Sequence, residues 1–391
     1  MRNYVERVGR PPVFVSNWDS DPGNQSLLGN IIASATTTSA RAFSDYAYGE
    51  DLTEEISCFL GLLARSGNVN LQPRNIAVTL NATNALYLSL HALKRLGVNR
   101  FLVITPTYYS VIETLDSFGS SVIYHHLLDE EAFFLDLKAI RRAVEWQQID
   151  AIILTDPVYS AGIEHDISAY SGLSAICNEH HIWLLCDYAL GGLFWHRPPT
   201  RLLDAAKLSA LSSLERFIYI ESPPKRLFLN GMKHAAVVAS SNVTNLIHDL
   251  ASRMSGGFCS TQLSVLKALY DPNNQTGIVA YMEGNRLRIE ANFASLQSSL
   301  LGTAFYTYSS NSGHFTMLCH KHRRIENANT KRIVKRLLWE HGLYVLPSEH
   351  FSYYGRNHFG VRINLMNDVS AFLIPLNRAL TEDPELLDAF R

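Results

Sequence analysis

Between residues 76 and 239, short apolar segments alternate with longer segments whose apolar residues recur at helical spacing. Strands are expected at 76–80, 101–105, 121–125, 151–154, 182–186, 217–220 and 235–239, and helices at 85–96, 111–118, 135–146 and 168–180. Short, continuous apolar strands that alternate with amphipathic helices are typical of a mostly parallel sheet covered by helices on both faces. The alternation therefore predicts an α/β fold.

After about residue 276 the pattern changes. A long helix at 278–301 precedes shorter strands at 304–308, 315–319, 344–346 and 360–365, with helices at 327–341 and from 368 onward. This pattern indicates a smaller α+β domain. Residues 1–44 are dense in turn-forming residues, and we read them as irregular and as completing this smaller domain. We expect a large domain over 45–275 and a small domain formed by 1–44 together with 276–391.

Composition narrows the functional classes. A length of 391 residues suits two domains, and a formal net charge of −2 gives no electrostatic reason to bind nucleic acid or an anionic membrane. No apolar segment approaches the ~18 residues that a membrane span needs, and the first residues lack a signal-peptide core. The five cysteines are scattered without metal-ligand spacing, which indicates reduced thiols and no metal site. We therefore expect a cytoplasmic protein.

Polar residues follow several of the expected strands. Thr83, Tyr108, Tyr159, Asp187 and Lys225 each come shortly after an apolar segment ends. Ligands of open α/β sheets bind beyond the carboxyl ends of the strands, so these residues are candidates for one site.

Lys225 stands in the most distinctive local sequence, Ser222-Pro223-Pro224-Lys225. Two adjacent prolines stiffen the backbone and aim the side chain that follows. Apolar sequence on both sides indicates a partly desolvated amine, which is what Schiff-base chemistry requires. A surface loop with an ordinary lysine would fit this stretch as well.

The order and spacing of these residues resemble the class I/II aminotransferases, the fold-type I enzymes that depend on pyridoxal 5'-phosphate. The resemblance implies a large domain with a mostly parallel sheet between helices, as in aspartate aminotransferases, and a smaller α+β domain. Ser222 and Lys225 match the Ser-x-x-Lys part of the family signature, and Lys233 stands where the family has its arginine. By this match Lys225 forms the Schiff base, while Ser222 and Lys233 bind the phosphate.

The resemblance assigns further roles, each with a physical reason. A carboxylate against the pyridine nitrogen keeps it protonated, helix N-terminal amides suit a phosphate, and arginine reads a carboxylate bidentately. The implied residues are Asp187 for the pyridine nitrogen, Ala82 and Thr83 for the phosphate, Tyr108 for stacking on the ring, and Arg362 for the substrate α-carboxylate. Tyr46 or Tyr48, of which we favour Tyr48, would reach the phosphate of a neighbouring subunit, so a homodimer with shared active sites is implied. Low charge content and abundant aromatics also fit an oligomer.

Three positions depart from the family pattern. Tyr159 replaces an asparagine that donates to the phenolic oxygen of the cofactor, and Leu190 replaces a tyrosine that bonds the same oxygen. Lys233 keeps a positive charge near the phosphate but lacks the arginine fork. We expect Tyr159 to be the remaining donor to the phenolic oxygen and Leu190 to form an apolar wall.

The resemblance implies an enzyme that acts at the amino group and Cα of an α-amino acid, with Lys225 as general base and acid. The departures leave open elimination, cyclisation or oxidation instead of transamination. Trp18, Asp19 and Asp21 would suit a basic, arginine-like side chain through stacking and charge-assisted hydrogen bonds. They also fit a solvated turn. A cofactor-binding sensor domain without catalysis is the remaining alternative.

Overall fold

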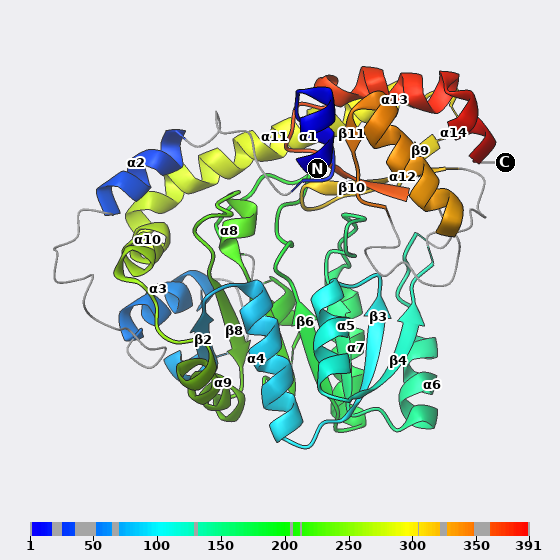
Figure 1. Cartoon of the computed structure of the whole chain (residues 1–391). Coiled ribbons are helices and arrows are strands. Elements are labelled where there is room, and N and C mark those ends of the chain that lie inside the picture. The colour runs from blue at the N-terminus through cyan, green and yellow to red at the C-terminus, as the bar shows by residue number, and fades with distance from the viewer. Residues whose placement is uncertain are drawn as a thin grey trace.

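The computed structural model describes residues 2–17, 26–35, 52–64, 70–128, 132–203, 206–211, 213–303, 305–320, 327–347 and 360–389. Figure 1 shows a twisted sheet with its helices in the lower part of the molecule and most of the later elements above it. Both ends of the chain lie in this upper part.

The main sheet has seven strands in the order β2-β8-β7-β6-β5-β3-β4. The strands are β2 (Ile76–Thr79), β3 (Arg100–Thr105), β4 (Ser121–His126), β5 (Ala151–Thr155), β6 (Trp183–Asp187), β7 (Phe217–Glu221) and β8 (Ala235–Ala239). Only β8 runs antiparallel to its neighbours, β2 and β7. The prediction of a mostly parallel sheet is confirmed, and its register places Asp187 beside Thr155 of β5 and Ile220 of β7.

Both faces of this sheet are buried. On one face α4 (Ala82–Arg95), α5 (Tyr109–Ser117) and α9 (Ser241–Met254) pack on alternate strand residues, among them Leu185 of β6. On the other face α6 (Leu137–Gln147) and α7 (Ile167–Glu179) cover the residues between, such as Leu184 and Cys186. Burial on both faces explains why these strands read as continuous apolar segments.

The later part of the chain surrounds a three-stranded antiparallel sheet in the order β12-β10-β9. Its strands are β9 (Phe305–Thr307), β10 (Phe315–His320) and β12 (Gly360–Asn364), and its helices are α11 (Gln275–Ser299), α12 (Asn327–His341), α13 (Ser370–Glu382) and α14 (Pro384–Ala389). The N-terminal segment joins these elements, because β1 (Val13–Phe14) pairs in parallel with β11 (Leu343–Tyr344). The domain boundaries themselves stay a prediction. No helix in the described ranges is long and apolar enough to cross a membrane.

The segment predicted to be irregular contains two helices, α1 (Arg2–Val8) and α2 (Ser26–Ala35), so that prediction is wrong in those places. The reason is tertiary: α1 buries Tyr4, whose ring lies 5.4 Å from that of Trp339 in α12. Packing of this kind stabilises helices that are too short to form alone. The other elements are α3 (Thr53–Ala64), α10 (Ser260–Tyr270) and the 3-10 helices η4 (Pro73–Asn75), η6 (Ala206–Ala210) and η7 (Pro272–Asn274).

The stiff segment expected before Lys225 is the short helix α8 (Pro223–Arg226). Proline suits the first positions of a helix because its fixed φ is helical and its missing N–H would have no partner there. The two prolines therefore start a helical turn that carries Lys225, rather than only stiffening a loop.

Candidate active site

A cavity of about 600 Å³ opens beyond the carboxyl ends of the parallel strands. It gathers residues that are far apart in sequence, as expected for an open α/β sheet. Its lining comprises Asn81, Ala82, Thr83, Tyr108, Tyr109, Thr155, Tyr159, Asp187, Ala189, Leu190, Ser222, Pro224, Lys225, Leu229, Asn230 and Lys233. All the described cofactor-binding candidates thus face one cavity.

The Lys225 amine is largely buried and lies 3.5 Å from Oδ1 of Asn230. Burial lowers its pKa to about 8, and the positive charges of Lys233 and Arg362 act in the same direction. The nearby Asp187 carboxylate opposes this shift by favouring the charged amine. A substantial neutral fraction near pH 8 is the property required of a nucleophilic lysine.

Asp187 ends β6 with its carboxyl group buried, accepting a hydrogen bond from the Ala189 backbone N–H at 3.2 Å. Burial raises its pKa to about 6, although the Ala189 N–H and the Lys225 charge lower it. A buried carboxylate with so few donors is best stabilised by a cation placed against it. A protonated pyridine nitrogen has the right charge, so this wall of the cavity fits pyridoxal phosphate.

Another wall suits the phosphate. Ala82 and Thr83 form the first turn of α4, which Asn81 caps by accepting a hydrogen bond from the Asn84 N–H at 2.8 Å. The exposed amides and dipole of a helix N-terminus attract anions, and the charge of Lys233 lies on the same cavity. The Ser222 hydroxyl also faces this cavity, but it donates a hydrogen bond to the His234 carbonyl at 3.0 Å.

Three tyrosines line the remaining side. The ring of Tyr108 lies 4.5 Å from that of Tyr109 and 5.4 Å from that of Tyr159, and the Tyr108 hydroxyl is 3.2 Å from that of Thr83. Tyr159 is buried, and its burial raises the pKa of its hydroxyl above the ordinary value. The hydroxyl group therefore stays protonated and can serve as a donor.

Arg362 in β12 is not one of the residues that line this cavity, but it interacts with Tyr159, which does line it. Its side chain is buried, donates from Nη2 to the Ser16 carbonyl at 2.6 Å, and lies over the ring of Phe315 at 4.3 Å. Burial lowers the pKa of the guanidinium to about 10, and its interaction with Tyr159 opposes that shift. The group remains charged near neutral pH and interacts electrostatically with Tyr159.

Some residues near the site had no role in the sequence analysis. Asn230 and Tyr109 line the cavity, and their positions next to Gly231 and Tyr108 gave no specific signal. His314 is buried beside Phe228 and Phe315, and its pKa lies well below the usual range because of burial and the charges of Lys225 and Arg362. The predicted residues Trp18, Asp19, Asp21, Tyr46 and Tyr48 lie outside the described residues.

The sequence of this chain is similar to those of known proteins. The family described as aminotransferase class I and II matches residues 23–370. An aspartate aminotransferase of Bacillus subtilis is 20% identical over 330 residues, covering 82% of this chain and 80% of the relative.

Solved structures share the fold. The aspartate aminotransferase of Thermotoga maritima superposes with a TM-score of 0.78 at 14% identity, covering 97% of this chain and 95% of that chain. The Thermus thermophilus aspartate aminotransferase with maleate gives 0.75 at 17% identity, with coverage of 97% and 95%. The predicted family and the predicted fold are both confirmed. The chain belongs to the class I and II aminotransferases and is a pyridoxal-phosphate-dependent, aminotransferase-like enzyme.

Proposed function

We propose that the protein transfers the amino group of an α-amino acid that it holds by its α-carboxylate. The observation that supports this most directly is the partly buried Lys225 amine, which shares one cavity with the buried carboxyl group of Asp187. When bound, pyridoxal phosphate supplies an electron sink for the negative charge that develops at Cα. The remaining tasks fall to side chains of this chain.

Lys225 would hold the cofactor and, once released, move the proton at Cα. A pKa lowered to about 8 keeps part of the amine neutral near physiological pH, as a general base requires. Asp187 would hold the pyridine nitrogen, while Ala82, Thr83, Ser222 and Lys233 would hold the phosphate and Tyr108 would cover the ring.

Arg362 would bind the substrate α-carboxylate, because a guanidinium matches a carboxylate with two parallel hydrogen bonds. Its interaction with Tyr159 supports a second role for that tyrosine besides donating to the phenolic oxygen of the cofactor. Leu190 lies on the cavity wall and contributes no hydrogen bond from its side chain.

A second candidate is elimination, cyclisation or oxidation of a basic, arginine-like amino acid. None of the described residues that line the cavity is an arginine, so the lining offers no guanidinium for a side-chain carboxylate. The combination of Tyr159, Leu190 and Lys233 also departs from the family pattern. Trp18 and Asp19 remain proposed contacts for a cationic side chain.

The two candidates differ in their need for an amino acceptor. The test incubates the loaded enzyme with arginine-type, neutral and acidic amino acids, each with and without 2-oxoglutarate. Stoichiometric formation of glutamate supports transamination. Consumption of an arginine-type amino acid without any acceptor supports the second candidate, and a preference for aspartate contradicts it. Amino acid binding without turnover under every condition would overturn both and favour a sensor.

We further propose a homodimer in which Tyr48 reaches the neighbouring site. A second cavity, lined by Asn230, Lys233, Gly231, Met232, Leu80, Cys259 and Gln262, adjoins the main one through Asn230 and Lys233. Such an opening at the phosphate end leaves room for a partner's side chain. Sedimentation should give twice the chain mass of 43.9 kDa, and Tyr48→Phe should weaken cofactor binding about tenfold without dissociating the dimer. A fully active monomer would contradict this.

A further inference from the structure

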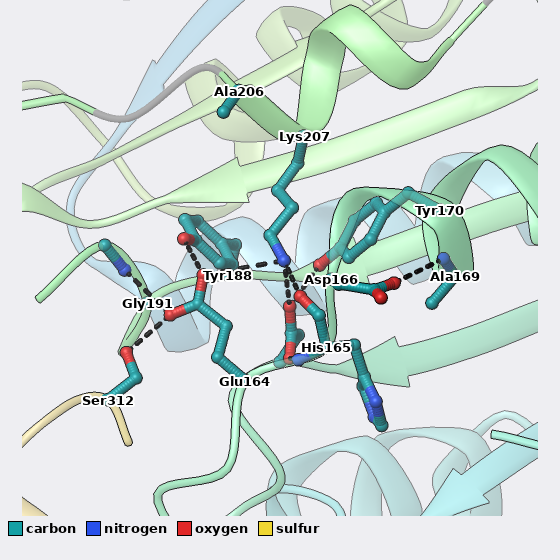
Figure 2. A network of polar contacts seen from close by, with 12 residues as sticks. Glu164, His165, Asp166, Ala169, Tyr170, Tyr188, Gly191, Ala206, Lys207 and Ser312 are labelled. Carbon is teal, nitrogen blue, oxygen red and sulfur yellow. Dashed lines mark hydrogen bonds and ion pairs between the residues drawn. The ribbon is translucent and has the colours of Figure 1, made fainter. Parts of the chain in front are cut away.

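Lys207 is a buried lysine that does not line the cavity of the candidate active site. Lys207 belongs to η6 and is almost completely buried. Its Nζ is 3.4 Å from Oδ2 of Asp156 and 3.6 Å from Oε1 of Glu164, and it donates to the His165 carbonyl (Figure 2). The ammonium also lies 4.6 Å from the centre of the Tyr170 ring.

Asp156 and Glu164 stand at the two ends of a short loop that has Tyr159 near its tip. Val158 and Ile163 pair across this loop, with the Val158 N–H donating to the Ile163 carbonyl at 2.7 Å. The single positive charge of Lys207 thus lies close to both ends of the loop. Asp156 also accepts from the His165 N–H at 2.9 Å, which closes the base of the loop.

The same two residues attach the loop to its surroundings. The Asp156 backbone N–H donates to the Asp187 carbonyl at 2.9 Å, which joins the loop to the end of β6. Glu164 accepts hydrogen bonds from the hydroxyls of Tyr188 and Ser312, and Ser312 belongs to the segment between β9 and β10. The network therefore holds together the loop, the end of β6 and the segment that carries Ser312 (Figure 2).

The Lys207 ammonium is the positive charge that faces the carboxyl groups of Asp156 and Glu164 in this network. Asp156 and Glu164 are both fully buried, and burial together with the Asp156 charge raises the pKa of Glu164 to about 7. Lys207 lowers that pKa, as the hydroxyls of Ser312 and Tyr188 also do. Removing the ammonium leaves two buried acids that repel each other at the two ends of the Tyr159 loop.

We propose that Lys207, Asp156 and Glu164 are positioning residues that hold the Tyr159 loop in place, and so set how Arg362, which interacts with Tyr159, presents its guanidinium to the substrate carboxylate. This inference rests on the proposed roles of Arg362 and Tyr159. None of the three residues lines the cavity, and their charged groups contact one another at the two ends of the loop, so we infer that they act through the loop.

A double-mutant cycle tests the proposal. The probe is 2-aminoisobutyrate, an amino acid without a Cα proton, whose binding is followed through the visible band of the bound cofactor. Lys207→Met and Tyr159→Phe are each expected to weaken its binding about tenfold. The double variant should be no weaker than Tyr159→Phe alone, within about twofold, because both changes remove the same contact. Multiplication of the two effects would overturn the proposal.

Ser312→Ala provides a milder variant that keeps the buried charges intact. It should weaken probe binding about threefold, and again should have no further effect in the Tyr159→Phe background. This variant decides the question if Lys207→Met does not fold, and a multiplicative effect here also counts against positioning.

Arg336→Met is the matched control, because Arg336 pairs with Asp383 at 2.7 Å in the C-terminal helices. It should lower the melting temperature but leave probe binding unchanged in both backgrounds. Arg362→Met tests the proposed role of Arg362 independently of the positioning residues. If it leaves probe binding unchanged, the proposed role of Arg362 fails, whatever the cycle shows.

Discussion

Replacing Lys225 with alanine is expected to abolish turnover and covalent attachment of pyridoxal phosphate. The amine lines the cavity with a lowered pKa, as the proposed nucleophile requires, and loss of its proton transfer alone should slow the reaction about 10²–10⁴-fold. Borohydride reduction followed by mass spectrometry of the peptides measures the attachment. The label should lie on Lys225 in the natural protein and be absent from the variant.

Lys233→Met is the matched control, since Lys233 lines the same cavity eight positions later. It should keep the covalent label and lose affinity for the cofactor, because the positive charge proposed to face the phosphate disappears. A label that moved to Lys233 or another lysine in the natural protein would refute the assignment of Lys225.

The pKa of Lys225 also sets how the cofactor-free protein captures its cofactor. Only the neutral amine attacks an aldehyde, and burial lowers the pKa from 10.5 to about 8. The capture rate should therefore rise with pH and reach half its maximum near pH 8. Asp187→Asn should move this midpoint to lower pH, because the Asp187 carboxylate favours the charged amine. A midpoint near 10 would show an ordinary lysine.

The sheet was predictable because its strands are buried on both faces and so appear as short apolar segments. Residues that follow the ends of parallel strands converge at one edge of the sheet, which is why Thr83, Asp187 and Lys225 could be grouped from the sequence alone. The helices α1 and α2 could not be predicted in this way. Their short sequences become helical through contacts such as that of Tyr4 with Trp339.

The Lys207 network was equally hidden in the sequence. Asp156, Glu164, Lys207 and Ser312 have no regular spacing, and an isolated lysine in a sequence most often lies at the surface. Only the folded chain shows that Lys207 is buried between two carboxylates. Departures from the family pattern at Tyr159 could be seen from the sequence, but what holds Tyr159 in place could not.

Arg362→Lys is expected to produce the largest loss in substrate binding of any change that leaves the cofactor in place. The guanidinium is held from two sides, by the Ser16 carbonyl at 2.6 Å and by the Phe315 ring at 4.3 Å. Although burial lowers its pKa to about 10, it carries a full charge at neutral pH. A lysine keeps a charge but cannot form two parallel bonds to a carboxylate.

Disrupting a buried, hydrogen-bonded charge pair costs about 2–5 kcal/mol, which corresponds to about 30- to 4,000-fold in kcat/KM. The loss should appear mainly as a raised KM for the amino acid, with the visible band of the bound cofactor unchanged, because Arg362 is not proposed to touch the cofactor. Arg286→Lys is the control, since Arg286 is also largely buried but pairs with Glu283 and Glu290 in α11. That variant should lose stability and keep its KM. An unchanged KM in Arg362→Lys would mean that the substrate carboxylate is bound elsewhere, and the polar residues that line the cavity, Asn230 among them, would then be the next candidates.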